Sequence, residues 1–195
     1  MTTRRLVGTA VALALASIGV QACQAAAPAP EPGGDVAGAV TNAVSASIRT
    51  SWQSARRNIT DSADLMPEAD FAFKPVDSVR TFGEILTHLA GANYVFCSAA
   101  LGEAPPHAEE AFEETVTSRD EIIKVLGESL AYCDTAYETA TDVSLAGTVT
   151  QPFGGGDGPR AAVLLGNIGH LNEHYGNLVT YFRMKGMVPP SSRQQ

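Results

Sequence analysis

The chain has 195 residues, of which 45% are apolar, and a formal net charge of -8. These values are typical of a single soluble globular domain with an additional segment attached. The acidic surplus argues against nucleic acid as a partner, because proteins bind the phosphate backbone through Lys and Arg.

The first 22 residues have the pattern of an export signal. Arg4 and Arg5 precede an uncharged apolar run, residues 6–20, and the sequence VQAC ends at Cys23. The run is shorter than the roughly 18 or more apolar residues of a typical membrane-spanning helix. We expect cleavage before Cys23 and lipidation of that cysteine, with ordinary cleavage among residues 22–27 as the alternative. Either outcome predicts an exported protein, in the periplasm or as a lipoprotein of a bacterial envelope that contacts the membrane only through its lipid anchor.

Residues 23–40 are rich in Ala, Pro and Gly and are predicted to form a flexible linker. Four segments with helical periodicity follow, over residues 41–65, 81–100, 118–138 and 159–186. Each carries one apolar stripe, so the sequence predicts an all-α four-helix bundle over residues 41–192. The stripe positions are Val44, Ile48, Trp52, Ala55 and Ile59; Phe82, Ile85, Leu89, Ala92 and Phe96; Ile122, Val125, Leu126, Leu130, Cys133 and Tyr137; and Leu164, Ile168, Leu171, Tyr175, Leu178 and Phe182.

Two capping patterns and one loop refine these boundaries. Thr81 with Glu84, and Ser118 with Glu121, have the spacing of capping boxes at the starts of the second and third helices. Glu84 also precedes His88 by four residues, so a role as a ligand, a supporting carboxylate or a base is an alternative. The connection over residues 138–158 contains VSLAGTVTQPF, which is compatible with a small hairpin. It also contains a Gly-rich stretch, which is either a flexible turn or a lid over the metal site described below.

Cys97 and Cys133 are predicted to form a disulfide. Apart from Cys23 they are the remaining cysteines, and an even pair in an exported protein is usually bonded. Cys97 lies on the edge of the second helix opposite His88, and Cys133 lies on the inward stripe of the third helix. Two buried free thiols are the alternative.

Three histidines occupy equivalent positions on two helices. His170 and His174 are four residues apart on the last helix, beside its apolar stripe, and His88 precedes Leu89 on the second helix just as His170 precedes Leu171. If these helices are neighbours, three neutral imidazoles converge and leave a fourth position open, which is the arrangement of a catalytic metal site. Gly91 and Gly166 lie on the same faces and would leave room for a cavity.

Two further residues near this pattern are not assigned to the site. His107 lies in the acidic segment 103–115 and is expected to be a surface histidine, because no helical face fixes its position. Glu173 lies between the paired histidines in sequence but points away from them around the helix.

The segments MPEADFAFKP, SVRTFGEILTHLAGANYVFCSAALGE and GNIGHLNEHYGNLVTYFRMKGMVPPSS together resemble the DinB-like family of metal-binding four-helix bundles. The resemblance covers about residues 41–192. It implies that His88, His170 and His174 bind a divalent metal ion. It also implies an up-down-down-up bundle, which we expect to have a long crossover between the first and second helices. Members of the family include thiol-cofactor-dependent transferases and isomerases, and many have no known activity.

Two functions remain open from the sequence. In the first, the three histidines hold zinc or nickel, which activates a thiolate or water for the transfer, isomerisation or hydrolysis of a small molecule not identified by the sequence. In the second, the protein binds a metal or a partner in the envelope without turnover. The oligomeric state is also open, with a homodimer as one option.

Overall fold

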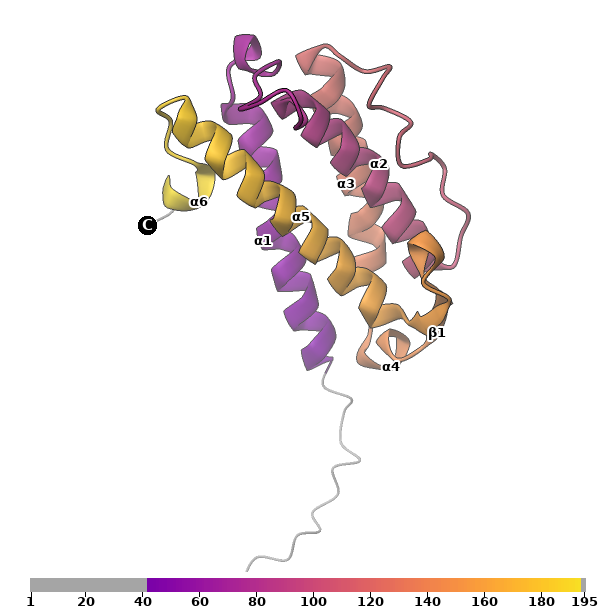
Figure 1. Ribbon diagram of the computed structural model, residues 1–195. Coiled ribbons are helices and arrows are strands. Elements are labelled where there is room, and N and C mark those ends of the chain that lie inside the picture. The colour runs from indigo at the N-terminus through magenta and orange to yellow at the C-terminus, as the bar shows by residue number, and fades with distance from the viewer. Residues whose placement is uncertain (1–41, 194–195) are drawn as a thin grey trace, which may run out of the picture. The chain divides into compact units, whose positions relative to one another are not determined.

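The computed structural model describes residues 42–193 (Figure 1). The predicted signal, residues 1–22, the linker, residues 23–40, and the predicted lipidation site Cys23 lie outside the described residues. Within the described part, none of the helices is both long and apolar enough to span a membrane.

Four long helices form a bundle, in agreement with the predicted all-α class (Figure 1). The connections contain shorter elements, including a two-stranded antiparallel hairpin in which Val149 lies opposite Gly158, within the segment where a hairpin was predicted. The long helices are α1 (Ala43–Leu65), α2 (Phe82–Leu101), α3 (Arg119–Glu138) and α5 (Arg160–Met184), and the short elements are η1 (Glu68–Asp70), α4 (Asp142–Leu145), β1 (Thr148–Thr150), η2 (Pro152–Gly154), β2 (Asp157–Pro159) and α6 (Pro190–Arg193).

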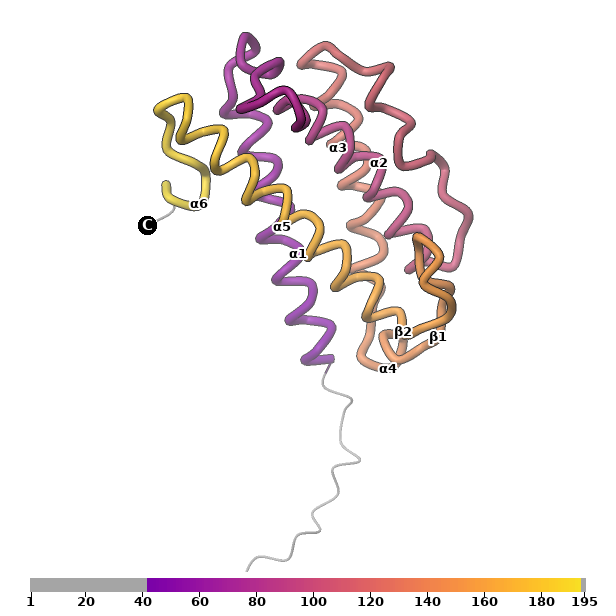
Figure 2. The backbone as a smooth tube through the Cα atoms, in the orientation of Figure 1, coloured from indigo at the N-terminus to yellow at the C-terminus, as the bar shows by residue number. Residues whose placement is uncertain are grey.

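The helices run up, down, down and up, as the family resemblance implied (Figure 2). The position of the long crossover was predicted wrongly. Because α2 and α3 run in the same direction, the segment joining them, residues 102–118, must return along the whole bundle, whereas residues 66–81 between α1 and α2 stay at one end (Figure 1). The crossover segment therefore lies over α2.

The helix starts follow from local chemistry. Thr81 and Glu84 form the predicted capping box, in which the Thr81 hydroxyl accepts from the Glu84 backbone N–H and the Glu84 carboxylate accepts from the Thr81 backbone N–H. At the start of α3 only half of the predicted box forms: the Ser118 hydroxyl accepts from the Glu121 backbone N–H, while the Glu121 carboxylate accepts from the Ser118 hydroxyl and not from its backbone N–H. Gly186, with φ 70°, follows the end of α5 in the left-handed conformation that glycine adopts without strain.

The apolar stripes meet in one core. Trp52 stacks on Tyr137 with ring centroids 4.3 Å apart, and its indole N–H donates to Asp134. Phe71 closes one end of the bundle by packing edge-on against Phe82. Among the predicted stripe positions, Val44 is a clear exception because it is exposed in the first turn of α1, beyond the end of the core.

The predicted disulfide between Cys97 and Cys133 is present and fully buried. The Cα atoms are 5.2 Å apart and the bond ties α2 to α3 near their lower ends. The chain joins α2 to α3 only through the long crossover segment. The disulfide adds a second, direct covalent link between the two helices.

Removing the disulfide should destabilise the bundle. The bond spans 36 residues, for which the loss of loop-closure entropy in the unfolded chain predicts about 3–4 kcal/mol of stabilisation. We expect the Cys97→Ala/Cys133→Ala variant to remain helical and to lose about this free energy in urea denaturation. Two thiols that titrate in the denatured, non-reduced protein, produced in an oxidising compartment, would contradict the bond.

Candidate metal centre

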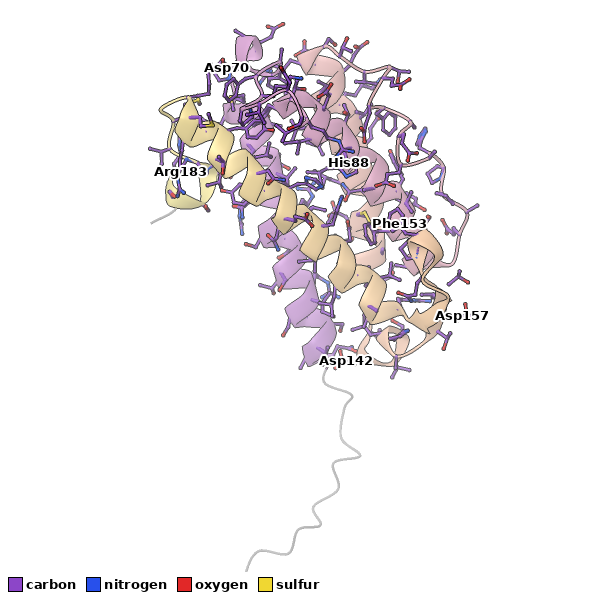
Figure 3. The ribbon with its side chains drawn as sticks, viewed as in Figure 1. Asp70, His88, Asp142, Phe153, Asp157 and Arg183 are labelled. Atoms are coloured by element: carbon purple, nitrogen blue, oxygen red, sulfur yellow. A yellow bond between two sulfur atoms is a disulfide. The ribbon has the colours of Figure 1, made fainter. Side chains whose placement is uncertain are left out.

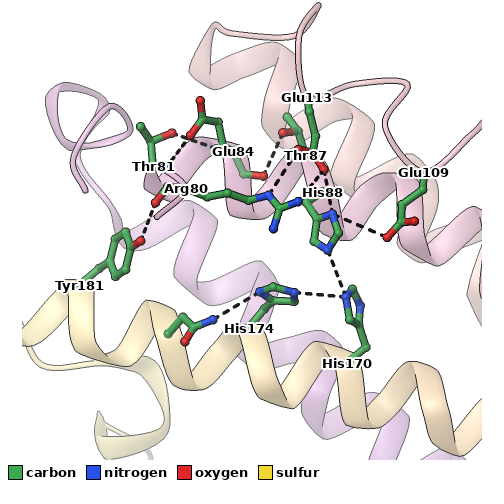
Figure 4. A network of polar contacts seen from close by, with 11 residues as sticks. Arg80, Thr81, Glu84, Thr87, His88, Glu109, Glu113, His170, His174 and Tyr181 are labelled. Atoms are coloured by element: carbon green, nitrogen blue, oxygen red, sulfur yellow. Dashed lines mark hydrogen bonds and ion pairs between the residues drawn. The ribbon is translucent and has the colours of Figure 1, made fainter. Parts of the chain in front are cut away.

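The structure brings together the three histidines that were expected to converge. His88 lies on α2 and faces α5, which carries His170 and His174 (Figure 3). The Nε2 atoms of His88 and His170 are 3.2 Å apart, and those of His170 and His174 are 3.1 Å apart. The candidate ligand atoms of all three residues lie within 4.8 Å of one another (Figure 4).

The helix stripes determine this convergence. Leu89 and Leu171 are fully buried in the core, and each histidine that precedes one of them is turned by about 100° around its helix, to the edge of the α2–α5 interface. His174 follows His170 by one helical turn and shares its face. His88 is buried, while the two histidines of α5 are half-buried.

The distances fit a bound metal ion. Two imidazole nitrogens that each lie about 2.0–2.1 Å from zinc at a tetrahedral angle are about 3.3–3.4 Å apart. The observed separations of 3.1 and 3.2 Å need only a small adjustment to reach that geometry. Three neutral nitrogen donors on two helices fit zinc, nickel, copper or iron, because imidazole suits all four ions.

The electrostatics keep the two half-buried imidazoles neutral. Burial, and then the neighbouring His174 and His88, lower the pKa of His170 from 6.5 to about 3. Burial, and then His88, lower the pKa of His174 from 6.5 to about 4. Both rings therefore present an uncharged donor at neutral pH, which is the form that binds a metal ion.

A carboxylate from the crossover segment supports His88. Glu113 Oε1 lies 2.8 Å from His88 Nδ1 and Glu109 Oε1 lies 3.8 Å from it (Figure 4). Arg80 donates from Nε and Nη2 to the two carboxylate oxygens of Glu113, each at 3.3 Å. A proton on His88 Nδ1, held by Glu113, leaves Nε2 with its lone pair directed at the other histidines.

The other two histidines have weaker outer contacts. The side-chain amide of Asn177 lies 3.5 Å from His174 Nδ1, and a rotation of the amide by 180° would place its oxygen there to accept from Nδ1–H. His170 Nδ1 is buried without a hydrogen-bond partner among the described residues. His88 is therefore the most firmly oriented of the three rings.

Sequence reasoning missed Glu109, Glu113 and Arg80. The acidic segment 103–115 lies outside the four predicted helices, so no helical face fixed its side chains, and its path depends on which connection crosses the bundle. Glu84, for which the sequence left a role as a supporting carboxylate open, caps α2 instead.

Two of the residues placed near the site have other surroundings. His107 is exposed and packs on Tyr94 and Phe112, with ring centroids 4.8 and 5.0 Å away, so it lies outside the histidine cluster. Glu173 is exposed on α5, as its helical position predicted.

Gly91, one of the two glycines near the histidines, was interpreted wrongly, because the space beside it is filled by backbone and is not a cavity. A Cβ on Gly91 would overlap the backbone of Glu109, so this glycine lets the crossover segment approach α2 closely. A Cβ on Gly166 would lie 3.3 Å from the ring of Phe96, a tight contact. The close approach at Gly91 brings the Glu109 and Glu113 carboxylates to His88.

An open pocket adjoins the cluster on the side of His174. Its volume is about 580 Å³, and its walls come from the segment before α2 and from the second half of α5, with His174, Arg80 and Tyr181 among the lining residues. Of the three histidines, His174 is thus the one that lines this pocket.

Comparison with known proteins identifies the class of bundle. The family model of the DinB superfamily matches residues 51–178, and the chain belongs to this superfamily. No curated protein sequence matches the chain.

Solved structures share the fold at low sequence identity. A DinB-like protein from Bacillus cereus is 20% identical, with a TM-score of 0.62 over 73% of this chain and 93% of that one. A DinB-like protein from Bacillus subtilis is 19% identical, with a TM-score of 0.57 over 73% and 93% of the two chains. A mycothiol-dependent maleylpyruvate isomerase is 18% identical, with a TM-score of 0.55 over 69% of this chain, which spans only 60% of the isomerase.

Replacement of Gly91 tests the role of the crossover segment. In Gly91→Ala the added methyl group must push the Glu109 backbone away from α2, which should cost about 1–3 kcal/mol of stability. The matched control is Gly127→Ala on α3, where nothing lies within 4 Å and the change should stabilise the helix by about 0.5–1 kcal/mol. Chemical denaturation measures both values, and equal effects of the two changes would refute the close approach.

The stability of the metal-free protein should depend on pH. Because the folded-state pKa values of His170 and His174 are about 3 and about 4, the unfolded chain binds more protons than the folded one between those values and 6.5. With a chelator present, stability should therefore be full above about pH 7 and fall as the pH drops toward 4. The His170→Asn/His174→Asn variant should show a smaller fall over this range in urea denaturation, and an unchanged fall would contradict the shifts.

Proposed function

We propose that His88, His170 and His174 hold a divalent metal ion, zinc or nickel, with a coordination position left for a small molecule. The observation that carries the proposal is the convergence of the three histidines beside an open pocket: His170 Nε2 lies 3.2 Å from His88 Nε2 and 3.1 Å from His174 Nε2, and the ligand atoms of all three lie within 4.8 Å of one another. A closed structural site would require a fourth protein ligand, and among the described residues no fourth histidine, cysteine or carboxylate joins the cluster.

The chemistry of such a site is activation of a weakly acidic group. A bound divalent metal acts as a Lewis acid that lowers the pKa of a coordinated water or thiol. The residues of the chain prepare the site for this role. Glu113 holds the proton of His88 on Nδ1, burial keeps His170 and His174 neutral, and the α2–α5 interface fixes all three rings.

The reaction proposed is transfer, isomerisation or hydrolysis of a small molecule by an activated thiolate or water. The DinB fold supports this class, since the structural neighbours include a mycothiol-dependent maleylpyruvate isomerase. The pocket of about 580 Å³ is of the size that small-molecule sites have.

The proposal includes a location outside the cytoplasm. The support is the buried disulfide between Cys97 and Cys133, since such bonds persist in oxidising compartments, together with the signal-like pattern of residues 1–22.

Removal of one histidine should separate the site from the scaffold. His170→Ala should abolish metal retention, measured by elemental analysis, while circular dichroism still shows a helical bundle, because the apolar core of four helices does not need a metal to fold. The control is His107→Ala, which alters a histidine outside the cluster and should leave the metal content unchanged.

Two outcomes would contradict the assignment. Equal loss of metal in His107→Ala would show that His107 also belongs to the site. A wild-type protein that retains no metal after exposure to zinc or nickel would remove the proposed function altogether.

A further inference from the structure

The pocket beside His174 is lined by one charged side chain, and that side chain is basic although the protein as a whole is acidic. The chain carries 21 acidic and 13 basic side chains, yet among the described residues that line the pocket Arg80 is basic and none is acidic. Arg80 forms an ion pair with Glu113, and Glu113 is not among the residues that line the pocket. The lining therefore offers a cationic hydrogen-bond donor and contains no carboxylate that would repel an anion.

The geometry of Arg80 leaves one edge of its guanidinium available. A guanidinium has five N–H donors on a planar fork, and Glu113 accepts from Nε and Nη2. Nη1 has no hydrogen-bond partner among the described residues. Because Arg80 lines the pocket, its remaining donors can form a bidentate pair with a carboxylate there.

The rest of the lining matches a short chain that ends in a carboxylate. Val79 and Ile85 supply apolar contacts for methylene groups, and Asn177 and Thr180 supply polar groups at the wall formed by α5. His174 belongs both to this wall and to the histidine cluster. Arg80 and one residue of the histidine cluster thus line the same pocket.

We infer that this pocket binds small carboxylates, with Arg80 pairing with the carboxylate while a second donor group of the same molecule occupies the open metal position. The inference rests on the proposed function, because it needs a metal held by the three histidines. It assigns to Arg80 the selection of the substrate class.

The test uses two probes that differ in a single charge. The zinc-loaded protein is titrated calorimetrically with the monohydroxamate of succinic acid and with its carboxamide analogue, in which the carboxylate is replaced by a neutral amide of similar size. Both carry the same zinc-binding hydroxamate. We expect the carboxylate probe to bind at least about tenfold more tightly, because hydrogen bonds to charged groups are stronger than those to neutral ones.

Variants then assign the preference to Arg80. Arg80→Gln should reduce the ratio of the two affinities to near unity while the carboxamide analogue binds as before. The control Arg57→Gln removes the same charge from an exposed position on α1 and should leave the ratio unchanged. Metal content is measured for every variant.

The outcomes separate the carboxylate pocket from the metal site. Equal affinities in the wild type, or an unchanged ratio in Arg80→Gln, would overturn the carboxylate pocket while zinc retention keeps the metal site intact. Equal weakening of both probes in Arg80→Gln would also overturn it, because Arg80 would then only support His88 through Glu113. Failure to retain zinc would overturn both proposals and is visible in the metal content alone.

Discussion

The burial of α2 on nearly every side is the constraint on which the structure depends. One face of this helix packs on α3 through the Cys97–Cys133 bond, another meets α5 at His88, and Gly91 admits the crossover segment against a third. A helix held by three different contacts has little freedom to rotate or slide. That restriction positions His88 against the two histidines of α5.

The crossover segment contributes chemistry as well as packing. Its path over α2 follows from the parallel direction of α2 and α3, and it brings the Glu113 carboxylate within 2.8 Å of His88 Nδ1. A buried imidazole that donates to a carboxylate has a fixed tautomer and a fixed ring orientation. Arg80 shares the same carboxylate and connects the histidine cluster to the adjoining pocket.

The sequence was informative where local periodicity determines the structure. The apolar stripes predicted four helices, and the offset of His88 and His170 from Leu89 and Leu171 predicted that both lie at stripe edges, because both features depend only on 3.6 residues per turn. Their convergence also required the two helices to be neighbours, which periodicity alone does not determine. The start of α2 at Thr81 and the disulfide between Cys97 and Cys133 were also predicted correctly. Glu113 was missed because its position depends on the route of a long connection, which no local pattern encodes. Gly91 was misread for the same reason, since the backbone that approaches it comes from that connection.

X-ray absorption at the metal edge tests the central claim most directly. The zinc-loaded protein should show three imidazole nitrogens at about 2.0–2.1 Å and a further light-atom ligand that is displaced by an added thiol, which is the signature of an open three-histidine site. Sulfur ligation before any thiol is added, a fourth imidazole, or a fixed ligand set that no added molecule displaces would contradict the account.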